Sequence, residues 1–129
     1  MNPEDRHYSS EHEWAKLEGD GSVQIGITEF AQEQLGDIVF VELPNIGVVI
    51  DQMQKIGEVE SVKSVSDIFS PISGEVVEVN QEIIETPELV NQEPYGAGWL
   101  IRVIPSNPDQ LDQLMSAGDY ELFLNSLDH

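Results

Sequence analysis

The stretch that decides the fold lies between residues 57 and 67 and reads Gly57-Glu58-Val59-Glu60-Ser61-Val62-Lys63-Ser64-Val65-Ser66-Asp67. Its side chains are short, and they are β-branched, hydroxylic or acidic on both sides of a single lysine. Because β-branched residues favour strands, this composition predicts a strand–turn–strand hairpin with Lys63 at its tip. The central pair Val62-Lys63 differs from the Asn-Gly and Asp-Gly pairs that two-residue hairpin turns prefer. The composition of the stretch therefore indicates the hairpin more strongly than its turn residues do.

Lys63 is one of only 5 lysine and arginine residues in a chain of 129 residues that contains 25 aspartate and glutamate residues. An amine displayed alone on a stiff hairpin can be found and acylated by an enzyme that recognises shape. We therefore predict that Lys63 carries a covalently attached, swinging cofactor. The plainer alternative is a solvated surface lysine with no function, since most lysines in any protein are exposed. The residues alone leave both interpretations open.

Length, charge and residue types limit the possible functions. A chain of this length predicts one domain spanning residues 1–129. It contains no cysteine, which excludes a disulfide framework and a cysteine nucleophile, and its three histidines lie too far apart to predict a metal site. The formal net charge of −20 argues against nucleic acid or an anionic membrane as a partner. The first thirty residues contain no apolar run of the signal-peptide type, so we expect a cytoplasmic protein, and we expect a monomer.

The chain before the lysine predicts strands around one short helix. Val23, Ile25 and Ile27 alternate with less apolar residues, which is typical of a half-buried strand. Thr28 is placed to cap a helix over residues 29–35, and Gly36 to end it. Residues 38–43 predict a second strand, and further short apolar runs recur about every ten residues. This spacing favours an all-β sandwich or barrel.

The two ends of the chain have different patterns. Residues 1–6 are polar, so we expect a loose N-terminus. Residues 107–127 predict a C-terminal helical segment, in which Asn107 can cap, Pro108 suits the first turn and Gly118 interrupts. The apolar residues of this segment recur at helical spacing and predict packing onto the β core: Leu111, Leu114, Met115, Tyr120, Phe123, Leu124 and Leu127.

Several short segments of the sequence resemble segments of the glycine cleavage system H protein family, and they occur in the same order as in that family. The hairpin stretch, followed by residues 70–76, resembles the lipoyl-attachment region of that family. The other segments that resemble this family are His12-Glu13-Trp14, residues 26–32, residues 35–44, Pro87-Glu88-Leu89-Val90-Asn91 and residues 94–100. The resemblance extends from Tyr8 to Tyr120, which is nearly the whole chain.

The resemblance implies a fold and a role. The fold would be mainly β, a flattened barrel or sandwich of two quasi-symmetric antiparallel sheets of the lipoyl and biotinyl carrier type, with a short helix in the N-terminal half and C-terminal helices. The role would be that of a non-catalytic carrier. It would take an aminomethyl group from glycine decarboxylase (P protein) to aminomethyltransferase (T protein), and electrons to dihydrolipoyl dehydrogenase (L protein). A lipoate ligase or lipoyltransferase would first attach lipoate to it.

The resemblance also implies site residues. Lys63 would carry the lipoyl group as an amide. The pocket for its aminomethyl form would contain Glu13 and Asp67, because a carboxylate pairs with an ammonium group. Ser66 and Ile27 would help to line the same pocket. The alternative for both acids is a solvated surface position.

Two departures from the family pattern leave other functions open. Met53 stands where the family commonly has a turn glycine, and Ser64 follows the lysine where alanine is commoner. They keep open an H-like lipoyl carrier that serves another assembly, in sulfur oxidation or lipoyl relay. A biotinyl carrier would be expected to have methionine on both sides of the lysine, where Val62 and Ser64 stand. A purely structural acidic domain with an unmodified Lys63 is the third alternative.

Overall fold

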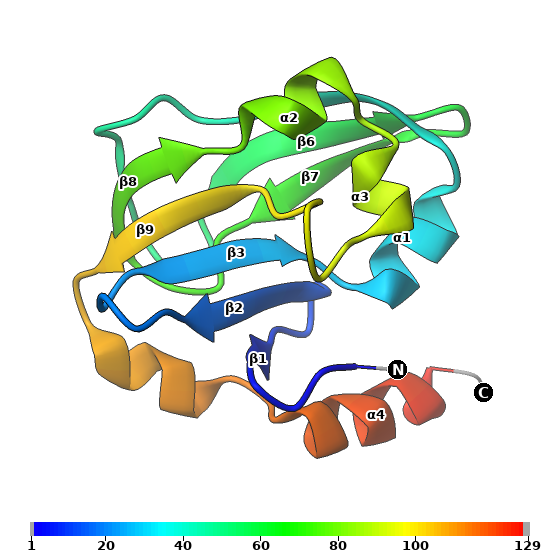
Figure 1. Cartoon of the computed structure of the whole chain (residues 1–129). Coiled ribbons are helices and arrows are strands. Elements are labelled where there is room, and N and C mark those ends of the chain that lie inside the picture. Colours follow the sequence, from blue (N-terminus) through cyan, green and yellow to red (C-terminus); the bar gives the residue numbers. More distant parts are fainter. Residues whose placement is uncertain (1, 128–129) are drawn as a thin grey trace.

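The computed structural model describes residues 2–127, which form two antiparallel sheets and a few short helices (Figure 1). The larger sheet has six strands in the order β1-β2-β3-β9-β8-β5. Its strands are β1 (His7–Tyr8), β2 (Glu13–Leu17), β3 (Val23–Ile27), β5 (Val49–Ile50), β8 (Gly74–Val79) and β9 (Ile101–Pro105). The smaller sheet has the order β4-β6-β7, with β4 (Ile38–Glu42), β6 (Lys55–Ser61) and β7 (Val65–Phe69).

The helices lie around this β structure. They are α1 (Glu29–Leu35), α2 (Gln81–Glu85), α3 (Leu89–Gln92), the 3₁₀ helix η1 (Pro108–Gln113) and α4 (Ala117–Ser126). None of the helices within residues 2–127 has the length and apolar character needed to cross a bilayer. The two-sheet architecture with few helices confirms the expected fold class.

The apolar side chains of both sheets form the core. Alternate residues of a strand point to opposite faces, and on β3 the inward residues Val23, Ile25 and Ile27 are almost completely buried. Val59 on β6 and Ile68 on β7 bring the smaller sheet into the same cluster. A second cluster, around Tyr8, Trp14, Ala117 and Tyr120, packs α4 against the beginning of the chain.

The predicted strand–helix unit is confirmed. Strand β3 covers residues 23–27, and Thr28 is the N-cap of α1, where its Oγ1 accepts a hydrogen bond from the Ala31 amide at 3.2 Å. Gly36 ends α1 with a φ of +80°, a conformation that residues with a Cβ rarely adopt. The next strand ends at Glu42, one residue earlier than expected.

Two expectations about the ends of the chain are wrong. Within the proposed loose segment, Asn2 and Arg6 are buried. The Arg6 guanidinium carbon lies 4.6 Å from the centre of the Trp14 ring, and the guanidinium donates to the Tyr95 carbonyl. The side-chain amide of Asn2 donates to the Glu121 carboxylate. Tyr95 and Glu121 are 89 and 119 residues away from their respective partners, so local composition could not indicate the contacts. The second wrong expectation concerns Gly118, which lies inside α4 and does not interrupt it.

The break in the C-terminal segment lies before Gly118. The first part, Pro108–Gln113, is a 3₁₀ helix capped by the Asn107 side chain, as its capping residues predicted. Leu114 is extended, and Met115 pairs with Tyr8 through two backbone hydrogen bonds of 2.8 Å. Helix α4 then starts after Ser116.

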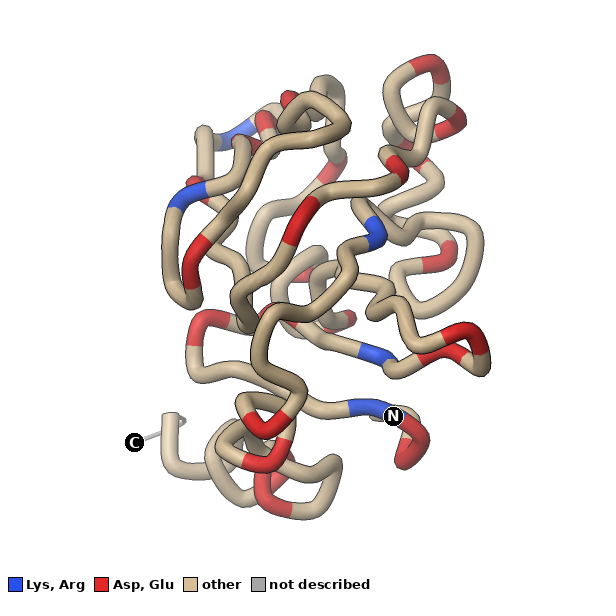
Figure 2. The backbone as a smooth tube through the Cα atoms, turned by 90° about the vertical axis from the view of Figure 1, so that its left-hand side faces the viewer, with Lys and Arg blue, Asp and Glu red and all other residues tan. Residues whose placement is uncertain are grey.

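Acidic residues are spread over the fold, and the few cations are scattered among them (Figure 2). Arg6 and Lys16 pair with Asp5, Arg102 pairs with Glu78, and Lys55 pairs with both Glu58 and Asp67. Within residues 2–127, Lys63 is the one lysine or arginine that forms no ion pair.

Met53 has a left-handed backbone. Its φ is +67°, and its amide donates to the Ser70 carbonyl at 2.7 Å in the turn between β5 and β6. For a residue with a Cβ this conformation costs roughly 1–2 kcal/mol. The glycine that the resembled family commonly has here would avoid that cost.

We predict that Met53→Gly is more stable than Met53→Ala by about 1 kcal/mol, because both variants lose the side chain and only alanine keeps the strained Cβ. Urea unfolding of the two variants measures the difference. Equal stabilities, or a more stable alanine variant, would show that the turn holds no strain.

Candidate functional site

Lys63 is exposed at the tip of the β6–β7 hairpin, which projects beside α1 and α3 (Figure 1). The tip is held by one side chain, that of Ser61. The Ser61 amide donates to the Ser64 carbonyl at 2.8 Å, and the Ser61 Oγ accepts from the amides of Lys63 and Ser64 at 3.1 Å each. Neither Val62 nor Lys63 has a positive φ, so the turn is not of the types that Asn-Gly pairs form.

Ser61 was not singled out as a site residue from the sequence. Serine side chains often bond to backbone amides two or three residues further along the chain, and this local signal could have identified it. Its hydroxyl gives the amides of Lys63 and Ser64 a hydrogen-bond acceptor within the turn.

The hairpin tip is docked on the connection between α1 and β4. The Val62 amide donates to the Asp37 carbonyl at 3.0 Å. Asn91, on α3, holds both sides of Asp37: its Nδ2 donates to the Gly36 carbonyl at 2.8 Å, and its Oδ1 accepts from the Ile38 amide at 2.9 Å. Asn91 lies in one of the segments that resemble the H-protein family, but the sequence predicted no role for it. Its partners lie more than 50 residues away in sequence.

The Lys63 stem passes directly over Gly36. A Cβ at residue 36 would lie 2.8 Å from Lys63 Cε, closer than real Cβ contacts allow. The absence of a side chain at Gly36 thus leaves room for the lysine stem at the end of α1. Beside this point, a cavity of about 580 Å³ opens between α1, the edge strand β7 and the adjoining ends of β2 and β3.

The cavity brings together all four residues expected to surround the carried group. Glu13 and Ile27 come from the paired ends of β2 and β3, and Ser66 and Asp67 come from β7. Its other lining residues are Glu11, His12, Phe30, Ala31, Gln34, Leu35, Val65, Ile68 and Phe69. Whether the four residues act on a bound group stays a prediction.

Glu13 is the buried acid of the cavity, with only 1% of its surface exposed. Its Oε1 accepts from the Ser9 hydroxyl at 2.7 Å, and its Oε2 accepts from the Phe69 amide at 3.3 Å. Burial raises the pKa of Glu13 to about 8, although these two hydrogen bonds act in the opposite direction. Burial therefore disfavours the ionised form of Glu13, the form on which the expectation from the sequence depends.

Asp67 is in a different environment from Glu13. Its side chain is 48% exposed, and its Oδ1 lies 3.2 Å from the Lys55 Nζ. Lys55 also lies 2.7 Å from Glu58, which is directly opposite Asp67 in the β6–β7 pairing. Lys55 thus forms an ion pair with each of two facing carboxylates, of which Asp67 lies at the outer rim of the cavity. Only the register of the hairpin shows this triad, and the sequence does not specify that register.

These residues fit a tethered acyl group. An unpaired, exposed amine stands on a rigid turn, its stem lies over a residue without a side chain, and a cavity begins next to it. The inner wall offers apolar surface from Ile27 and Ile68 and one carboxyl group, that of Glu13. Such a cavity can hold a small chain that ends in a cationic group and can keep water away from it.

Comparisons with known proteins agree with this geometry. The sequence profile of the family described as "Glycine cleavage H-protein" matches residues 6–127. The glycine cleavage system H protein of Carboxydothermus hydrogenoformans is 56% identical over 122 residues, which cover 95% of this chain and 93% of the relative. That of Thermus thermophilus is 52% identical and covers 96% of both chains.

A solved structure supports the same assignment at the level of the fold. The crystal structure of a glycine cleavage system H protein from Mycobacterium marinum superimposes with a TM-score of 0.89. It is 42% identical in sequence, and the match covers 96% of this chain and 99% of that one. The chain therefore belongs to the glycine cleavage H-protein family, and its role is that of the carrier protein of a glycine cleavage system.

Proposed function

We propose that the Lys63 Nζ carries lipoate as an amide and that the chain, without turnover of its own, moves the attached group between enzymes. The observation that supports this most directly is that Lys63, the one lysine or arginine within residues 2–127 that forms no ion pair, is exposed on a hydrogen-bonded turn near the cavity. A lipoate ligase or lipoyltransferase would acylate Lys63. The three enzymes visited would be glycine decarboxylase (P protein), aminomethyltransferase (T protein) and dihydrolipoyl dehydrogenase (L protein).

The chemistry of the bound group and that of the chain are distinct. When bound, lipoate supplies a disulfide that accepts an aminomethyl unit and a dithiol that is later reoxidised. Lys63 supplies the attachment point, and the lysine stem with its acyl chain gives a reach of roughly 15 Å. This reach is enough to enter the active site of a docked enzyme. It is also enough to fold back past Gly36 into the cavity.

We propose that Glu13 receives the cationic end of the carried group. Without a cation, burial keeps the Glu13 carboxyl protonated, as its pKa of about 8 reflects. An ammonium group within a few ångströms favours the ionised form and lowers that pKa. Glu13 would then release its proton to solvent as the cation enters, and the resulting carboxylate would accept a charge-assisted hydrogen bond from the ammonium group. Ile27 and Ser66 would line the cavity beside Glu13, and Asp67, paired with Lys55, would lie at the outer rim of the cavity.

Glu13 makes the stability of the fold depend on pH. Its folded pKa lies above the unfolded value near 4.5, so the folded state binds the proton more tightly and stability falls as pH rises between these values. We predict that the free energy of unfolding of the natural chain, relative to Glu13→Gln, falls by about 3 kcal/mol between pH 5 and pH 8. Urea unfolding of both proteins at several pH values measures this. Parallel stability curves would show that Glu13 ionises as readily in the folded chain as in the unfolded one.

We predict that Lys63→Arg loses lipoylation completely and keeps the fold, because an exposed tip residue adds little to stability. The measurement is the intact mass after treatment with a lipoate ligase, ATP and lipoic acid. Lys55→Arg is the matched control, since Lys55 is the other lysine of the same hairpin and should leave the mass gain unchanged. A mass gain that persists in Lys63→Arg would place the modification elsewhere. A parallel treatment with biotin ligase tests the biotinyl alternative.

The assembly served by the carrier can be tested directly. The relatives named above favour a glycine cleavage system and do not favour the alternative of another lipoyl-dependent assembly. We expect the lipoylated chain to support glycine–bicarbonate exchange by P protein and the unmodified chain to support none. A lipoylated chain that is inactive in this exchange would instead favour the other assembly.

A further inference from the structure

One buried hydroxyl on the C-terminal helix connects two parts of the cavity wall. Tyr120, on α4, is completely buried. Its hydroxyl oxygen lies 2.7 Å from the His12 Nδ1 and 2.8 Å from the Thr28 Oγ1. His12 lies just before β2, and Thr28 lies just after β3. The hydroxyl therefore joins the two strand ends at the point where the cavity opens.

Both partners of Tyr120 also hold the local backbone. Thr28 caps α1 through the Ala31 amide, and its own amide donates to the His12 carbonyl at 3.0 Å. His12 has a φ of +70°, in the left-handed region that a histidine rarely adopts, so its surroundings must hold it there. The His12 ring also packs against Phe30, with ring centres 4.6 Å apart.

The donors and acceptors fit one direction of hydrogen bonding. Thr28 Oγ1 already accepts from the Ala31 amide, so its own proton can be donated to Tyr120. Tyr120 then donates to the Nδ1 of a neutral His12, and each hydroxyl proton has one acceptor. Burial lowers the pKa of His12, in agreement with the neutral ring.

The residues held in this way line the cavity. His12, Phe30 and Ala31 are lining residues, and His12 is followed directly by Glu13 while Thr28 is preceded directly by Ile27. We propose that Tyr120 is a positioning residue, which fixes the Glu13 and Ile27 walls so that the cavity retains the arm attached to Lys63. This inference depends on the proposed function, because it takes the cavity to be the resting place of that arm.

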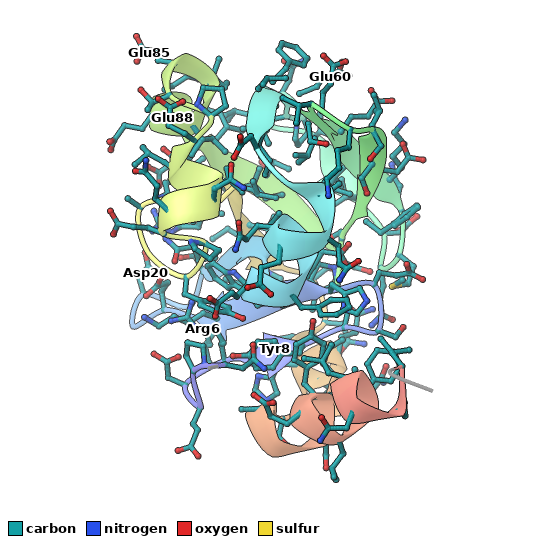
Figure 3. The ribbon with its side chains drawn as sticks, turned by 90° about the vertical axis from the view of Figure 1, so that its right-hand side faces the viewer. Arg6, Tyr8, Asp20, Glu60, Glu85 and Glu88 are labelled. Carbon is teal, nitrogen blue, oxygen red and sulfur yellow. The ribbon has the colours of Figure 1, made fainter. Side chains whose placement is uncertain are left out.

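The chain contains a matched control for the loss of this hydroxyl. Tyr8 stacks on Tyr120, with ring centres 4.8 Å apart, and is equally buried. Its hydroxyl donates to the Pro3 carbonyl, away from the cavity. Figure 3 shows Tyr8 close to α4 and far from Glu60, which lies on β6 toward the hairpin end. Tyr8→Phe therefore removes a comparable buried hydrogen bond without loosening the cavity wall.

The experiment compares Tyr120→Phe, Tyr8→Phe, Glu13→Gln and the natural chain. In the unmodified proteins, hydrogen exchange of the Thr28 and Ala31 amides reports on the wall. In the lipoylated proteins, the change in the Ile27 methyl NMR shift on modification reports on the arm in the cavity. The hydrolytic loss of the aminomethyl cargo reports on its protection.

We expect Tyr120→Phe to accelerate exchange of both amides, to reduce the Ile27 shift change and to speed cargo loss about fivefold, as the loss of one buried hydrogen bond would produce. Tyr8→Phe should leave all three close to the natural values, even where it lowers the unfolding temperature. Equal effects of Tyr120→Phe and Tyr8→Phe would show that the Tyr120 hydroxyl has only a structural role, and would overturn the inference. The absence of any effect of Tyr120→Phe would overturn it as well.

Glu13→Gln separates this inference from the proposed function beneath it. If Glu13→Gln speeds cargo loss and Tyr120→Phe does not, the cavity holds the arm but Tyr120 does not position it. If lipoylation leaves the Ile27 methyl unshifted in the natural chain and Glu13→Gln has no effect, the cavity is not the resting place, and both ideas fail together.

Discussion

The pairing of β6 with a strand on each side is the constraint on which the site depends. β6 is the central strand of the smaller sheet, hydrogen-bonded to β4 and to β7, and its inward residues belong to the core. A strand held in this way cannot tilt independently of the sandwich. Its end, and with it the turn at residues 62–63, therefore keeps a fixed direction. The Asp37 carbonyl adds one more support directly beneath the tip. The backbone of the tip is thus supported, while the Lys63 side chain is exposed.

Local patterns predicted the elements whose causes are local. The alternation of β3, the Thr28 cap, the stop at Gly36 and the cap at Asn107 all act within a few residues, and each could be predicted from the sequence. The wrong expectation at residues 2–6 depended on contacts that no local pattern contains, whereas the start of α4 before Gly118 has a local signal, the Ser116 side chain that accepts from the Asp119 amide. The buried state of Arg6, for example, depends on the Tyr95 carbonyl and the Trp14 ring.

The candidate site likewise has features that were expected from the sequence and features that were not. Four of the lining residues, Glu13, Ile27, Ser66 and Asp67, were expected at one pocket because the resemblance supplied long-range information that propensities lack, and the modification of Lys63 stays a prediction. The raised pKa of Glu13 was not predicted, because it depends on how completely the fold excludes water from that position. The ion pair of Asp67 with Lys55, the anchoring by Asn91 and the link through Tyr120 depend on register and on contacts across the fold. Such contacts follow only from the assembled structure.

The pairing of the other four cations has a consequence for how this protein meets a larger one. Each of those cations is offset by a neighbouring carboxylate, so acylation of Lys63 would leave no unpaired lysine or arginine within residues 2–127. With a formal net charge of −20 before modification, such a molecule attracts a basic surface within about a Debye length. Close contact at the tip would add the apolar surface of Val62 and Val65, which are 68% and 54% exposed on either side of Lys63. Added salt would then slow the first approach of any partner while changing the lifetime of the docked pair much less.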